Sequence, residues 1–122
     1  MATMKDEQAK QAVAKIHARI AEAEEKRERA KERGMDPLLR LCKVAQGDSG
    51  QCHHVRRFLL GLYNGYRWPF DLIRLRNLDS NLLDDCLAVL ELDARGGHEV
   101  HTYIKGGEDL WRSWWAMEDN DE

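Results

Sequence analysis

The first third of the chain has the apolar spacing of a helix but few large apolar side chains. Good helix formers dominate residues 4–33, and nothing there breaks a helix. Apolar positions recur four and three residues apart, as in a heptad seam, and only Val13, Ile16 and Ile20 among them are large. We therefore predict one long charged helix with too little apolar surface for a core of its own.

The following stretch predicts a helical hairpin. Asp36 and Pro37 are an N-cap followed by proline at the first helical position, and Gly47 is a natural stop. A second helix is expected from Gln51 to Tyr63, with Ser49 as its cap. The two expected buried stripes are Leu38, Leu41, Cys42 and Ala45, and then Cys52, Val55, Phe58, Leu59 and Leu62.

Further helices are expected in the second half of the chain. Asp71 caps a short helix through Leu78, a longer helix follows from Ser80 to Ala94, and a last one covers residues 108–117. Residues 98–104 are expected to be extended or a short strand. The longer helix is expected to bury one apolar face, made of Leu83, Cys86, Leu87, Leu90 and Ala94.

This pattern predicts a mainly α fold, a compact bundle of four to five helices preceded by a long charged N-terminal helix. We divide the chain into a charged arm at residues 1–34, a helical domain at residues 35–117 and an acidic tail at residues 118–122. With 122 residues there is room for one compact core, and a deep catalytic cavity would compete with it.

The net charge is only −3, but basic and acidic residues are concentrated in different segments of the chain. The segment from Asp79 to Glu122 sets three basic side chains against twelve acidic ones. Such a surface repels phosphate backbones and attracts basic proteins, which makes a basic or nucleic-acid-binding protein the expected partner. A solvated acidic face with a disordered tail is the alternative interpretation.

The composition argues against a membrane protein, a secreted protein or an enzyme. No apolar run approaches the ~18 residues of a membrane span, and three cysteines without a secretory segment favour a reducing cytoplasm. His53 and His54 with His98 and His101 lack zinc-site spacing, and the sequence shows no nucleophile with a partner base. We therefore expect no catalytic residue, no metal and no cofactor.

The candidate partner-binding residues are in the last helix. Trp111, Trp114 and Trp115 lie beside the acids Glu108 and Asp109, and tryptophan is the residue most enriched at binding hot spots. We expect at least one of the three indoles to be solvent accessible. The alternative is that two close the core and the third covers the Trp68 segment.

The hairpin at residues 36–63 offers a second hypothesis, a helix-turn-helix-like DNA-binding protein. Its second helix carries side chains that reach base edges and phosphates: Gln51, His53, His54, Arg56 and Arg57. The acidic second half of the chain opposes duplex binding.

The arm offers a homodimer through Val13, Ile16 and Ile20. Docking of this helix on its own domain, or simple solvation, are the alternatives, because so short a seam is weak evidence for a coiled coil.

Residues 38–64, above all the run from Val44 to Gln51, resemble an uncharacterised bacterial domain family found on plasmids and integrative mobile elements. The likeness continues at Phe70-Asp71-Leu72, at Asp84-Asp85 and in the Trp-Arg-x-Trp from Trp111 to Trp114. This resemblance implies an accessory protein of a mobile element, and such proteins include anti-CRISPR and other anti-defence inhibitors. The expected function is therefore a non-enzymatic protein-binding module that docks through acidic and Trp-rich surfaces.

Overall fold

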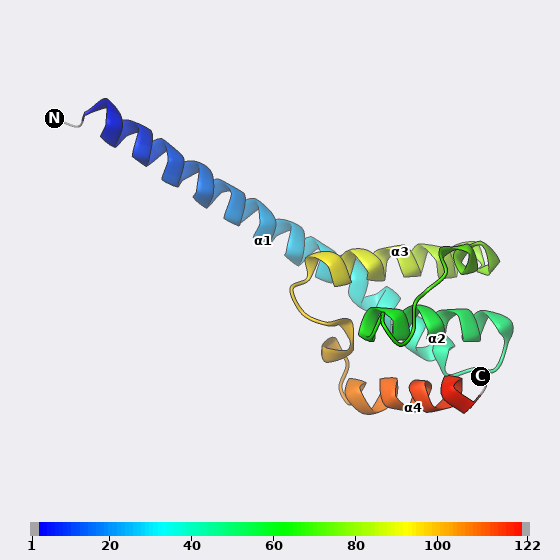
Figure 1. Ribbon diagram of the computed structural model, residues 1–122. Coiled ribbons are helices and arrows are strands. Elements are labelled where there is room, and N and C mark those ends of the chain that lie inside the picture. The colour runs from blue at the N-terminus through cyan, green and yellow to red at the C-terminus, as the bar shows by residue number, and fades with distance from the viewer. Residues whose placement is uncertain (1–2, 121–122) are drawn as a thin grey trace.

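The computed structural model describes residues 3–120, and helices carry the whole architecture (Figure 1). Two short 3₁₀ helices, η1 and η2, join four α-helices. The mainly α prediction is confirmed. In chain order the elements are α1 (Met4–Ala45), α2 (Gly50–Tyr63), η1 (Leu72–Asn77), α3 (Ser80–Arg95), η2 (Val100–Tyr103) and α4 (Gly107–Asn120).

Helix α1 is continuous for 42 residues, about 63 Å at 1.5 Å per residue. Its first turn is closed by a capping box between Thr3 and Asp6. The predicted helix start at Asp36 and Pro37 is wrong, because the helix runs through both residues. A proline inside a helix costs roughly 3 kcal/mol. Here Pro37 is buried together with the neighbouring α1 residues Gly34 and Leu38, and α1 packs along α3, which offsets that local cost.

The body of the protein is built around large buried side chains. Trp68, Trp111 and Trp114 are fully buried, and leucines of α1, α2 and α3 pack around them. Helix α2 contacts both α1 and α4. The expected caps are confirmed at two helices, since the Ser49 side chain accepts from the Cys52 amide and the Asp71 side chain accepts from the Ile73 amide.

Two sequence expectations in the second half of the chain are wrong. Residues 100–103 form the 3₁₀ helix η2, where an extended segment or strand was expected. In α3, Leu87 and Leu90 are 50% and 42% exposed, and Ala94 is also exposed. The buried residues of α3 are Asp85, Cys86, Val89 and Leu92. Helix α3 thus carries two apolar stripes, and contact with α1 determines which one is covered.

Candidate functional site

The tryptophans expected to bind a partner are divided between the core and the surface. Trp111 is 0% exposed and Trp114 is 1% exposed, and the Trp111 indole donates to the Leu59 carbonyl at 3.0 Å. The assignment of these two residues to a partner surface does not fit this structure, because the small core needs their volume. Trp115 is half-buried, and its ring meets the Trp68 ring edge-on at 5.6 Å between centroids.

The acids at the start of α4 have different surroundings. Asp109 is exposed, whereas Glu108 accepts from the Tyr63 hydroxyl at 2.7 Å and from Arg112 Nε at 3.1 Å. The imidazole of His101 lies 3.1 Å from the same carboxylate. The hydrogen bond from Tyr63, followed by the contacts with Arg112, holds the pKa of Glu108 below its ordinary value. Glu108 therefore ties α4 to α2 and η2.

Glu118 is the ionic centre of the molecule. It is fully buried, and it accepts from Arg56 Nε at 3.0 Å and Arg57 Nε at 2.6 Å, with His53 Nδ1 2.8 Å away. Burial alone would raise the pKa of Glu118, but the hydrogen bonds from Arg57, Arg56 and His53 outweigh burial and lower it. The carboxylate is thus held in its charged form among three basic side chains.

The sequence analysis missed this role, because Glu118 was grouped with the acidic tail. Structurally it belongs to the last turns of α4, whereas Asp121 and Glu122 of that tail lie outside the described residues. A signal was present, since Trp111, Trp114 and Glu118 follow one another at three and four residues and therefore share one helix face.

The residues of the DNA-binding hypothesis all make contacts within the protein. Arg56 is buried and also donates to the carbonyls of Ala45 and Gly47, at the end of α1. Gln51 exchanges two hydrogen bonds with Asp79, through the Asp79 side chain and its backbone amide. The ring of His54 lies 3.2 Å from Arg74 Nη1. Helix α2 is therefore packed inside the body, and its basic residues hold the fold together.

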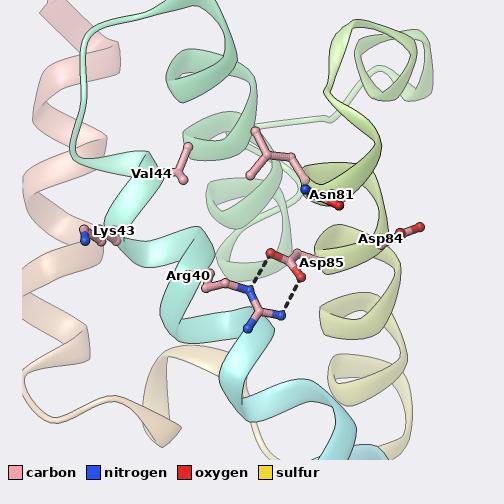
Figure 2. Close-up of a pocket in the computed structure, with 7 residues that line it drawn as sticks. Arg40, Lys43, Val44, Asn81, Asp84 and Asp85 are labelled. Atoms are coloured by element: carbon pink, nitrogen blue, oxygen red, sulfur yellow. Dashed lines mark hydrogen bonds and ion pairs between the residues drawn. The ribbon is translucent and has the colours of Figure 1, made fainter.

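A groove of about 710 Å³ lies between α1 and α3, and Figure 2 shows its lining. Arg40 bridges it to Asp85 with two hydrogen bonds of 3.0 and 2.8 Å. The ion pair fastens the two helices. The groove is lined by Arg40, Lys43, Val44, Asn81, Leu82, Asp84 and Asp85, with no nucleophile beside a base.

Two cysteine thiols, those of Cys42 and Cys86, lie in the core and are unreactive. Burial raises the pKa of Cys42 and of Cys86 to about 12, so neither is a thiolate at neutral pH. Within residues 3–120, no cluster of three or more His, Cys, Asp or Glu side chains has the geometry to hold a metal ion. None of the described helices is long and apolar enough to cross a membrane.

The arm, residues 4–26 of α1, extends beyond the body (Figure 1). Every residue in it is exposed, and Val13, Ile16 and Ile20 are 50%, 54% and 51% exposed. Ion pairs between its own side chains, such as Lys26 with Glu22 at 3.1 Å, stabilise this part of the helix. The arm is therefore a helix with one apolar stripe, and the body does not cover the large side chains of that stripe.

The comparisons with known proteins give a family and no activity. A family model described as "Family of unknown function (DUF7673)" matches residues 35–119, which leaves the arm outside the match. No curated protein and no solved structure matches the chain. The expectation of an uncharacterised domain family is confirmed by this match.

Proposed function

Because this chain belongs to the DUF7673 family of unknown function, we propose its role from its own surfaces. The protein is a non-enzymatic protein-docking module, and the arm is the element that holds the partner. The single observation that carries this proposal is that every residue from 4 to 26 is exposed, with the three large β-branched side chains of Val13, Ile16 and Ile20 on one stripe.

The energetics of an isolated helix support a partner for the arm. Helices in water gain most of their stability from packing of an apolar face, and short charged helices alone are marginal. Each i,i+4 ion pair contributes only about 0.2–0.5 kcal/mol. Val13, Ile16 and Ile20 are already about half covered, so burying each against a partner adds roughly half of the ~1.5–3 kcal/mol that full burial of such a side chain provides.

The rest of the surface supports docking less strongly. Trp115 is half-buried, and it lines a shallow hollow with Tyr63, Arg112 and Asp119, which is a smaller candidate contact on α4. The DNA-binding alternative is weaker, since Arg56, Arg57 and His53 are already paired with Glu118. A basic protein partner remains part of this proposal because of the acidic second half of the chain, and a cytoplasmic location because of the cysteine pattern. A mobile-element role such as anti-CRISPR inhibition rests on the sequence resemblance alone.

The test is capture of a partner from a bacterial lysate by the immobilised full chain, with and without nuclease. Ile16→Glu places a charge on the stripe, and we expect it to cost roughly 2 kcal/mol or more in binding, as loss of a hot-spot residue does. The matched control is Ala18→Glu, which adds the same charge to a different face of the arm. Equal capture by both variants would exclude the arm as the docking element, and loss of capture with nuclease would point to nucleic acid.

A further inference from the structure

The molecule exposes a second apolar stripe, and it lies on α3. Leu83, Leu87, Leu90 and Ala94 recur at four and three residues, so they share one helix face, and each is at least partly exposed. The opposite face carries Asp85, which pairs with Arg40, and Leu92, which lies against Gly34. The outer stripe of α3 therefore points away from α1.

The two stripes match in length. The arm stripe, from Ala9 to Ala23, rises about 21 Å, and the α3 stripe, from Leu83 to Ala94, rises about 17 Å. Each stripe contains three large side chains: Val13, Ile16 and Ile20 in the arm, and Leu83, Leu87 and Leu90 in α3. Two helices with such stripes bury them by packing side by side.

The charges beside the two stripes are opposite. Residues 8–21 of the arm contain Lys10, Lys15 and Arg19 and no acidic side chain. The outer stripe of α3 is flanked by Asp84, Glu91 and Asp93, with Arg95 at its end. Glu91 also lies 3.9 Å from Arg33 and from Arg95 of its own chain. Complementary charge of this kind sets partner choice and alignment more than affinity.

The arm stripe cannot reach α3 of its own chain. Helix α1 runs antiparallel to α3, as the contacts of Arg40 with Asp85 and of Arg33 with Glu91 show. Arg27 lies beside Gly97, just past the end of α3, and the helix continues straight from there into the arm (Figure 1). The large side chains of the stripe, from Val13 to Ile20, therefore lie beyond the end of their own α3, and only Ala23 borders a hollow that Ala94 and Arg95 also line.

We propose that the occupant of the outer stripe of α3 is the arm of a second copy, in a reciprocal two-fold dimer. This inference rests on the proposed docking role of the arm and names its partner. If the two-fold axis ran along α1, the arm of each copy would lie past the end of the other copy's α3. An axis perpendicular to α1 reverses the second copy, so that each arm lies beside the other copy's α3. Each arm then runs parallel to the α3 that it covers, because α1 and α3 are antiparallel within one chain.

The parallel alignment also satisfies the charges. With Ile16 level with Leu87 of the second copy, Arg19 comes next to Glu91 and Glu24 comes level with Arg95. Because of the two-fold symmetry, the contact between an arm and an α3 occurs twice in the dimer. This brings the total buried area toward the roughly 1,000 Å² that a specific interface needs.

The experiment is sedimentation equilibrium of the full chain from about 1 µM to about 1 mM, a range that covers weak dimers. The wild type is expected to dimerise. Ile16→Glu and Leu87→Lys alter exposed side chains, and each should weaken the dimer about 100-fold or more, since each change is present twice. Ala18→Glu should leave the dimer unchanged.

Mixing the two variants gives the sharpest outcome. A mixed dimer has one contact of Glu at position 16 with Lys at position 87, and one wild-type contact. Mixing Ile16→Glu with Leu87→Lys is therefore expected to restore dimers that neither variant forms alone. Restoration also shows that both variants are folded.

Three results would overturn the inference. A wild type that stays monomeric at about 1 mM has no such contact. A dimer lost in Ile16→Glu but kept in Leu87→Lys means that arm pairs with arm. Variants that are both monomeric and do not recover on mixing exclude reciprocal docking. If lysate capture still depends on Ile16 in these cases, the docking role of the arm survives; if it does not, the proposed function fails as well.

Discussion

At the scale of single residues, Glu118 binds three basic side chains of α2. A fully buried carboxylate needs paired charges, and Arg56 and Arg57 supply them, while His53 lies within hydrogen-bond distance of the same carboxylate. Arg56 additionally closes the last turn of α1 through the carbonyls of Ala45 and Gly47. One acidic residue thus fixes the ends of three helices.

Glu118→Gln should lower the free energy of unfolding by roughly 3 kcal/mol, because it leaves the buried Arg56 without a counter-charge. The pKa of Glu118 is held below 4.5 in the folded state, so its contribution is present above that pH and is lost as the pH falls through the folded value. The variant should therefore also show a weaker loss of stability in acid. Urea unfolding from pH 7 to pH 3 measures both effects.

The control for this change is Asp119→Asn, which removes one partner of a more exposed ion pair with Arg67. We expect it to cost less than about 1 kcal/mol. Equal losses for the two variants would contradict the central role of Glu118.

At the scale of elements, α1 and α3 pack closely together because Gly34 of α1 has no side chain. A Cβ atom added at Gly34 would lie 2.8 Å from the Leu92 Cβ and 3.3 Å from the Ala88 carbonyl oxygen. Gly34 is mid-helix, where glycine costs about 1 kcal/mol relative to alanine. The close approach of the two helices outweighs that cost.

Gly34→Ala should therefore destabilise the protein by roughly 1 kcal/mol or more, since the overlap with α3 exceeds the gain in helix propensity. Gly50→Ala is the matched control, because nothing lies within 4 Å of its added Cβ. It should be neutral or slightly stabilising. Thermal unfolding of both variants checks the prediction, and a stabilised Gly34→Ala would show that the helices separate easily.

At the scale of the whole molecule, the protein is a compact body with a helix that extends beyond it. From the sequence we expect a charged arm at residues 1–34 without a core of its own. The structure places the boundary earlier, because Arg27 lies beside Gly97 and Ala30 is buried. Residues 4–26 are exposed throughout and make no contribution to the core.

Deleting residues 1–26 should leave a cooperative transition, with a midpoint within about 5 °C of the full chain and a nearly unchanged urea m-value. The measurement belongs at low protein concentration, where self-association adds nothing to stability. A loss of the transition would show that the arm supports the body after all.

Features that depend on neighbouring residues could be predicted from the sequence: most of the helical segments, the Ser49 and Asp71 caps, and a charged arm too poor in large apolar side chains for a core. Tertiary structure decided what depends on distant contacts. It carried α1 through Pro37, because packing along α3 offsets a local penalty. It chose which stripe of α3 is covered, since both have helical spacing and only the position of α1 distinguishes them. It also buried Trp111, Trp114 and Arg56. The sequence alone does not distinguish a surface position from a core position for these side chains, because their partners come from other parts of the chain.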